Sequence, residues 1–484
     1  MNAEVGTQQA GASTADWWLV IALTAASALV LFDVTAFGVA LPSLRADLGL
    51  GPAAAGWVVN AYIVAVTALT ALGGRLADRL DRVRVFQAGA ALFALASLAC
   101  GLTPDLPGLA APWLIAFRAL QGAGGAVMLP AAMAAVVAAV PAEMRGRAIS
   151  VFIGAGQVFF ILGPVLGGLM TEQLSWRMIF LVALPLAAAA IAMTRARARS
   201  NSQSSRKAGT GGPLLRWTAV PLILGLALLV LGLERGASWG WLSPATLGTV
   251  ALGVAALAVM VWREWGVADP LVQLHLLRRR DFAMQMPTLC LLQTVTIGIL
   301  TFAPIYFERL MGLSPGTTGF VMLAFVGGWA GMVPVAGWLY DRIGPTWPKL
   351  AGAVLALAGL TWWGWSLPGM DLAVQLPAML LSGIGVGLSL LPAGTAAISA
   401  APPDGHAATV GLIQTVRQSG GIFAVALLGG LFLAHSADSG TAVAAAQTGF
   451  AIMIAAAALN LPVALAGLRG RRPAAAAAPD EGSC

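Results

Sequence analysis

The stretch LFDVTAFGVALP, residues 31–42, places a single acid, Asp33, inside an almost uninterrupted apolar run from Trp17 to Leu41. That run is long enough for a helix to cross the hydrocarbon core of a bilayer, which needs about 20 residues. Asp33 lies about two-thirds of the way along it. Ionising a lone carboxylate there is costly, and such residues mark functional sites in membrane helices.

The composition places the whole chain in the membrane class. Of its 484 residues, 59% are hydrophobic and 10% are charged, and the mean hydropathy is +0.85. Soluble proteins carry roughly 25% charged residues. The 58 glycines indicate close helix–helix packing. Cys100, Cys290 and Cys484 are far apart and show no metal-ligand spacing.

Hydrophobic runs of spanning length recur along the chain and are continuous, not alternating as in a membrane barrel. We therefore expect an all-α integral membrane protein with fourteen transmembrane helices, at residues 17–41, 53–74, 84–102, 110–139, 147–170, 177–195, 215–234, 242–262, 283–307, 315–340, 350–367, 373–398, 407–434 and 444–467.

Basic residues fix the expected orientation. With the N-terminus in the cytoplasm, the predicted inner loops hold 21 of the 27 Lys and Arg residues, and the outer loops hold four. This asymmetry favours both termini inside. The basic excess is thus a topology signal that meets anionic lipid, and it does not require nucleic acid.

An internal repeat relates the first six spans to the last six. Landmarks recur at an offset of 262 or 263, pairing Gly74 with Gly337, Asp78 with Asp341, Pro130 with Pro392, Pro141 with Pro403 and Pro42 with Pro304. Two parallel six-helix halves with a site between them are a known transporter plan. We expect a six-helix bundle at 1–196, a cytoplasmic linker at 197–213, two inserted helices at 214–264, a second six-helix bundle at 265–468 and a disordered cytoplasmic tail at 469–484.

Several motifs carry a resemblance to a known family. LFDVTAFGVALP in span one, GRLADRLDRVR at 74–84, RALQGAGGAVMLP at 118–130, GQVFFILGPVLGG at 156–168, SWRMIFLVALP at 175–185 and VRQSGG at 416–421 resemble motifs of the major facilitator superfamily. The closest resemblance is to its fourteen-span bacterial drug–proton antiporters. Two positions depart from the family pattern: Asp81 stands where Gly is usual, and Ala183 where Asn is common.

Asp33 and Arg118 are the expected proton-coupling residues. Their repeat counterparts are Val295 and Leu380, so the fold of the repeat does not demand either charge. The resemblance implicates this arginine in proton transfer, and we expect it to work with Asp33, directly or through water. The alternatives are an acid that reaches an outer water cavity or caps a helix, and an arginine that holds backbone carbonyls.

The fifth span carries the residues that the resemblance marks as an antiporter motif: Gly154, Gly163, Pro164, Gly167 and Gly168. Gly163 and Gly167 are four residues apart and share a helix face, so a neighbouring backbone can approach them. Pro164 removes one helix hydrogen bond and bends the helix. The motif implies a gate at the outer helix ends, and export in preference to uptake.

Charged loops after spans two and ten form an expected conformational latch on the inner side, made of Gly74, Asp78, Arg79, Arg82, Asp341 and Arg342. Positive-inside anchoring explains the arginines but not the two acids. Polar residues within spans form the candidate substrate cavity: Tyr62, Gln121, Gln157, Gln293, Gln414 and Arg417. A purely structural role for Arg417 is an equal alternative.

Other protein classes fit less well. An ATP-driven pump needs a Gly-Lys-Ser/Thr phosphate loop, and the two lysines, Lys207 and Lys349, precede Ala and Leu. The three histidines are scattered, so an enzyme is not indicated. We predict a monomeric, proton-coupled exporter of amphipathic drugs or toxic small molecules, cations included, in the bacterial cytoplasmic membrane. It would need no metal, cofactor, nucleotide or nucleic acid. An importer or exporter of one metabolite is the nearest alternative, and a membrane sensor a more distant one.

Overall fold

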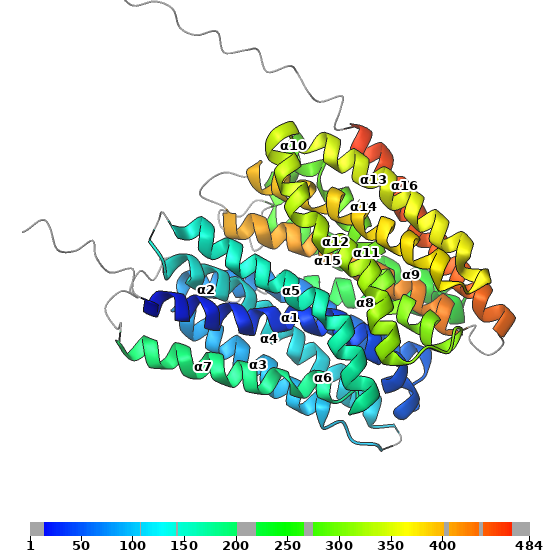
Figure 1. Ribbon diagram of the computed structural model, residues 1–484, viewed down its shortest axis with the longest axis horizontal. Helices are drawn as coiled ribbons and strands as arrows, with labels where there is room; N and C mark the ends of the chain where they lie inside the picture. Colours follow the sequence, from blue (N-terminus) through cyan, green and yellow to red (C-terminus); the bar gives the residue numbers. More distant parts are fainter. Residues whose placement is uncertain are drawn as a thin grey trace, which may run out of the picture.

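The computed structural model describes residues 14–106, 108–141, 144–200, 219–265, 274–400, 406–434 and 439–466. Within these residues the regular structure is entirely helical (Figure 1). The first part contains α1 (Thr14–Asp47), α2 (Pro52–Arg79), α3 (Arg82–Gly101), α4 (Ala110–Ala138), α5 (Arg145–Gln173), α6 (Met178–Leu181), α7 (Ala183–Ser200), α8 (Ala219–Trp239) and α9 (Pro244–Glu264).

The remaining helices are α10 (Arg280–Ala283), α11 (Met286–Arg309), α12 (Pro315–Ile343), α13 (Thr346–Ser366), α14 (Leu372–Ser399), α15 (His406–Ala434) and α16 (Ser439–Ala466), with short 3₁₀ turns at Leu274–Arg278 and Leu367–Gly369. Most of the predicted linker and the whole predicted tail lie outside the described residues. The predicted domain boundaries themselves stay predictions.

Twelve segments of the described chain are long and apolar enough to cross a bilayer, with α6 and α7 together forming one of them. The two other predicted spans correspond to α8 and α15, whose shorter apolar stretches are Val220–Leu233 and Leu412–Leu428. The predicted all-α membrane fold is therefore confirmed.

Short polar loops set several helix starts. The Ser243 and Ser314 hydroxyls accept hydrogen bonds from the backbone N–H groups of Thr246 and Thr317, and a proline follows each serine as the first helical residue. Asp81 and Asp371 cap α3 and α14 in the same way. The side-chain oxygens satisfy N–H groups that have no partner inside the helix. Asp81 thus has a structural role at the position where the resembling family usually has glycine.

The helices form two bundles with matching internal contacts. In the first, α2 and α3 pack on α4, α1 packs on α5, and α7 contacts α1 and α3. In the second, α12 and α13 pack on α14, α11 packs on α15, and α16 contacts α11 and α13. The two sets correspond pair for pair, as the sequence repeat predicts. In Figure 1 the blue-to-green bundle lies below the yellow-to-red one.

The inserted helices are a separate pair. α8 and α9 pack mainly on each other, and α8 also contacts α2 and α15. Because α2 and α15 belong to different bundles and pack against each other, the pair lies beside one junction between the bundles. A second junction is formed by α5 and α12, and α1 also contacts α11 across the bundles.

The α5–α12 junction is tight at one end. A Cβ atom at Gly168 would overlap the carbonyl oxygen of Pro315, and one at Gly319 would overlap that of Pro164. Nearby, the Glu172 carboxylate on α5 accepts hydrogen bonds from the Ser314 hydroxyl (2.9 Å) and the Gly316 N–H (2.7 Å) at the start of α12. Backbone therefore lies against backbone where α5 ends and α12 begins; we call this the sealed end.

The same two helices separate at their other ends. Gly327 lies about three turns after Gly316 on the same face of α12, and Gly154 lies about four turns before Gly168 on the same face of α5. A Cβ atom at either Gly327 or Gly154 would meet no described atom within 4 Å. Since small residues on one face normally accompany close helix approach, the free space shows that the two backbones are further apart here than at the sealed end. The rings of Phe160 on α5 and Trp329 on α12 still meet, with centroids 4.5 Å apart. We call this the open end.

Replacing Gly319 with Val tests the sealed end. The added side chain would meet the α5 backbone, and overpacking of this kind costs about 1–3 kcal/mol, so we expect a lower unfolding temperature in detergent. Gly327→Val on the same helix is the matched control and should leave that temperature nearly unchanged. Equal unfolding temperatures for the two variants would contradict the tight packing at Gly319.

Candidate functional site

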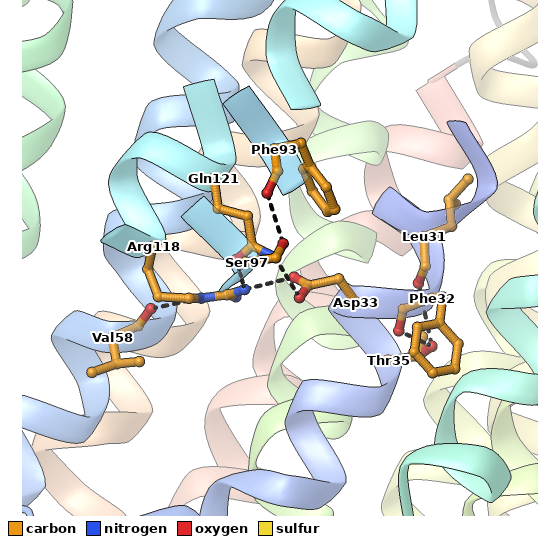
Figure 2. Close-up of polar contacts among 9 residues, drawn as sticks. All are labelled: Leu31, Phe32, Asp33, Thr35, Val58, Phe93, Ser97, Arg118 and Gln121. Carbon is orange, nitrogen blue, oxygen red and sulfur yellow. Dashed lines mark hydrogen bonds and ion pairs between the residues drawn. The ribbon is translucent and has the colours of Figure 1, made fainter. Parts of the chain in front are cut away.

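Asp33 and Arg118 form a direct ion pair inside the first bundle (Figure 2). The Arg118 Nη1 donates to the Asp33 Oδ2 at 2.7 Å, and the two residues are 2% and 3% exposed respectively. The pair joins α1 to α4, two helices brought together by the fold. A charge-assisted hydrogen bond of this length is among the stronger polar contacts in proteins.

Gln121 completes the hydrogen bonding of the pair. It lies one turn after Arg118 on α4, and its amide oxygen accepts from the Arg118 Nη1 at 2.7 Å. Its amide nitrogen lies within hydrogen-bonding distance of the Asp33 Oδ1 (3.1 Å) and of the Ser97 hydroxyl on α3 (2.8 Å). The Arg118 Nε also makes a long contact, 3.4 Å, with the carbonyl of Val58 on α2. Four helices thus meet at one polar cluster.

Aromatic rings hold the guanidinium of Arg118. Its Cζ lies 4.3 Å from the ring centroids of both Phe37 and Tyr62, and 5.7 Å from that of Phe180. Such cation–π contacts stabilise a desolvated arginine. Phe37 lies four residues after Asp33 on the same helix face, so its place beside Arg118 could have been inferred from the sequence. Ser97 gave no comparable signal.

A narrow cavity of about 20 Å³ adjoins the pair between the two bundles. Its lining comes from α1, α2 and α4 of one bundle and α11 of the other: Val34, Phe37, Gly38, Val59, Tyr62, Ile63, Arg118, Ile297, Leu300 and Thr301. This volume accepts a water molecule. A Cβ atom at Gly38 would overlap the Leu300 carbonyl oxygen, so α1 and α11 touch beside it.

The acids Asp33 and Glu308, on α1 and α11, have different surroundings. Asp33 is in direct contact with Arg118, the partner expected from the sequence, and with Gln121, because folding places α4 opposite α1. Glu308 lies near the C-terminal end of α11, a position where a carboxylate is usually easy to solvate. It is half-buried, and its Oε1 is fully buried without a hydrogen-bond partner among the described residues. Packing around the end of α11, which hydropathy does not reveal, shields it.

The candidate cavity residues divide into two groups. Tyr62 lines the cavity, and Gln121 belongs to the ion-pair cluster. Gln157 and Gln414 are half-buried on α5 and α15, and the amide of Gln293 donates to that of Gln418 at 3.1 Å. Arg417 is also half-buried. These four candidates do not line the narrow cavity.

The span-five motif contacts both bundles. Cβ atoms at Gly163 and Gly167 would overlap Thr35 and Ala36 of α1, whereas Gly168 and the Pro164 carbonyl face α12. Gly154 meets nothing within 4 Å of the described structure. The shared face expected for Gly163 and Gly167 therefore packs on α1.

The expected latch residues lie at the open end. Asp341, Arg342 and Arg82 are exposed, and Arg79 is half-buried; the guanidinium of Arg342 covers the Trp338 ring at 4.4 Å. The side chain of Asp78 lies outside the described set. A Cβ atom added at Gly74 would come no closer than 4.0 Å to its nearest neighbour, Pro130, so this glycine has no tight helix contact. A Cβ atom at Gly73 would overlap the Ala126 carbonyl oxygen, so the close approach of α2 to α4 occurs there.

A buried ion pair beside a cavity between two repeated six-helix bundles is the architecture of a secondary transporter. Comparison with known families matches residues 23–425 to the Major Facilitator Superfamily. That match spans most of the chain, so the protein belongs to the Major Facilitator Superfamily, and it is a transporter and not an enzyme. The resemblance inferred from the motifs is confirmed.

Curated relatives cover most of the chain. It is 34% identical over 476 residues to the cephamycin export protein CmcT of Amycolatopsis lactamdurans, covering 95% of each chain. It is 33% identical over 444 residues to the puromycin resistance protein pur8 of Streptomyces alboniger, covering 90% of this chain and 86% of that protein. The multidrug resistance protein Stp of Mycobacterium tuberculosis is 30% identical over 408 residues, with 84% and 74% covered.

Solved structures share the fold. A bacterial homologue of the human lysosomal transporter Spinster matches with a TM-score of 0.66 at 15% identity, covering 96% of this chain and all of that one. The peptide transporter POT in complex with sulfate matches with a TM-score of 0.66 at 18% identity, covering 93% and 94%. At these identities the likeness concerns the fold alone.

A double-mutant cycle tests the ion pair. Asp33→Asn and Arg118→Gln each leave one buried partner unsatisfied, which costs about 3–5 kcal/mol. We expect the double variant to lose less stability than the sum, with a coupling energy above about 1 kcal/mol. Thermal unfolding of the purified protein measures this. The distant pair Asp33→Asn and Arg84→Gln should be additive, and additivity in the Asp33–Arg118 cycle would argue against the contact.

Proposed function

We propose that this protein is an antiporter that exports amphipathic toxic small molecules in exchange for protons. The observation that carries the proposal is the buried Asp33–Arg118 pair beside a cavity between the bundles. The printed names of the relatives, which include drug resistance and antibiotic export, support this substrate class.

Asp33 is the proposed proton carrier. Protonation removes its negative charge, so Arg118 loses its counter-ion and the link between α1 and α4 weakens. Phe37 and Tyr62 keep the guanidinium in place during this step, because their contacts with Arg118 do not depend on Asp33. The charge of one carboxyl group thereby changes the relative stability of two bundle arrangements.

The conformation described here corresponds to an inward-facing state in the proposed cycle. The charge asymmetry of the loops assigns the sealed end to the outside and the open end, with Arg342 and Arg82, to the cytoplasm. Export then requires the α5–α12 junction to separate at Gly168 and Gly319 while the open end closes. Rocking of two bundles about a central site achieves this exchange.

The latch residues would act in the opposite state. Asp341 and Arg342 are exposed in the present conformation, so they are free to form contacts when the cytoplasmic ends converge. Asp78 and Arg79, from the first copy of the repeat, are their proposed counterparts. Charged pairs of this kind would hold the inner side closed while substrate leaves.

The proposed setting is the cytoplasmic membrane of a bacterium. Both termini would face the cytoplasm, and a single chain would suffice, because both bundles and the site between them come from one chain. The coupling ion is the proton. We propose no cofactor, nucleotide or nucleic acid partner.

A proton-coupled transporter of one metabolite is the second candidate, since nothing in the ion pair itself fixes the direction of transport or the number of substrates. A protonophore separates the directions: it raises cellular accumulation of a fluorescent dye if the protein exports that dye, and lowers it if the protein imports it. A sensor that does not transport would leave accumulation unchanged.

Replacing Asp33 with Asn tests coupling. We expect export driven by an imposed pH gradient in energised inverted vesicles to fall at least about tenfold, because Asn cannot carry the proton. Asp371→Asn is the matched control: that carboxylate is exposed and caps α14, and Asn can also cap. At equal expression, undiminished proton-driven efflux by the Asp33 variant would refute the assigned role.

A further inference from the structure

Arg417 differs from the other deeply placed arginine in having no counter-charge. Arg118 contacts Asp33, Gln121 and two aromatic rings at 4.3 Å. In the described structure Arg417 has no hydrogen-bond or ion-pair partner, and its Nε is fully buried and unsatisfied. A charge held within a membrane protein without a partner is costly. Because the Arg417 side chain, unpaired among the described residues, destabilises the folded protein, its presence calls for a role other than stabilising the fold.

The position of Arg417 places it beside the path between the bundles. It lies one helical turn before Gly421, whose Cβ would approach the Ile297 side chain to 3.0 Å, and Ile297 lines the narrow cavity. Gly420, on the same side of α15, packs against Cys290 of α11. Arg417 therefore faces α11 on the open-end side of the cavity, at a rise of about 6 Å from Gly421.

Among the described side chains, no acid pairs with Arg417. α15 contains no Asp or Glu, and the acid of α11 is Glu308, near the opposite end of that helix. α2 and α8 also pack on α15, and their acids, Asp78 and Glu234, have side chains outside the described set. Gln418 and Gln293, which bond to each other at 3.1 Å, add neutral amide groups beside the arginine. Asp33 is already neutralised by Arg118. The charge along this part of the path is therefore positive.

We propose that Arg417 is the anion-binding subsite of the transport path, and that the molecules exported carry a carboxylate or a similar acidic group on an apolar body. This proposal rests on the proposed function and names its substrate class. The guanidinium matches a carboxylate with two parallel hydrogen bonds. The apolar walls at Ile297, Leu300 and Phe37 would accept the apolar body once the cavity widens.

A substrate anion supplies the partner that Arg417 lacks. A cationic substrate would instead meet an uncompensated guanidinium in a medium of low dielectric, where repulsion is strong. The site thus favours acids over the cations considered from the sequence.

A pair of probes with the same apolar body, one anionic and one neutral, tests the subsite. 1-Pyrenebutyric acid and its methyl ester share one apolar body, and quenching of tryptophan fluorescence reports their binding to the purified full-length protein in a neutral detergent. That medium contains no acidic lipid headgroup. We expect the acid to bind at least about tenfold more tightly than the ester. If the wild-type protein bound the acid and the ester with equal affinity, the proposal would be overturned, and no variant would be needed to show it.

Substitutions then assign the preference to Arg417. Arg417→Gln should abolish the preference for the acid, and Arg417→Lys should retain part of it. The exposed Arg84→Gln is the matched control and should retain all of it. A folded Arg417→Gln protein, checked by its unfolding temperature, that still prefers the acid would refute the assignment.

Transport separates this proposal from the proposed function. Export of both probes is measured in proteoliposomes with an imposed pH gradient. If the protein binds the acid preferentially but does not export it, the anion-binding subsite stands and the export of such molecules is refuted. Export of the ester and the acid at equal rates, unaffected by Arg417→Gln, would refute the subsite and leave the exporter standing.

Discussion

The structure depends on the free-energy cost of burying a charged side chain in the interior of a membrane protein. A carboxylate within a transmembrane helix has to find a partner or lose its charge, and Asp33 meets Arg118 at 2.7 Å with Gln121 bound to both. The need for a partner favours a rotation of α1 and α4 that brings Asp33 and Arg118 face to face. In the proposed cycle a single proton has a large effect, because adding it to Asp33 removes the charge that balances Arg118.

The second constraint is close contact between backbones across the bundle junction. At the sealed end, Gly168 and Gly319 allow α5 and α12 to approach until no Cβ atom fits between them. Such an interface has little tolerance for intermediate separations, since packed surfaces are either in contact or apart. The same two helices have free space around Gly154 and Gly327, and there they meet through side chains such as Phe160 and Trp329. Contact along this junction is therefore backbone to backbone at one end and side chain to side chain towards the other.

Much of the architecture could be predicted because hydrophobic length and charge bias act locally along the chain. The offset between Pro42 and Pro304 revealed the repeat, and the helix contacts of the two bundles correspond pair for pair. Asp33 and Arg118 were identifiable as candidates since each is a charge in an apolar span. Ser97, the burial of Glu308 and the close approach at Gly73 instead of Gly74 were not, because each depends on which neighbour a helix face meets.

The sequence by itself determined that the chain is an all-helical membrane protein built on an internal repeat, because a bilayer demands about 20 apolar residues for each crossing whatever the packing. Twelve segments of the described chain meet that length, and the two other predicted spans have shorter apolar stretches. Only the tertiary structure decided which charges are paired. Asp33 and Arg118 are 85 residues apart and come into contact through folding, whereas Arg417 stays without an acid although its own motif looks equally polar. Side-chain pairing depends on helix rotation and approach, and these follow from packing between segments that are distant in sequence.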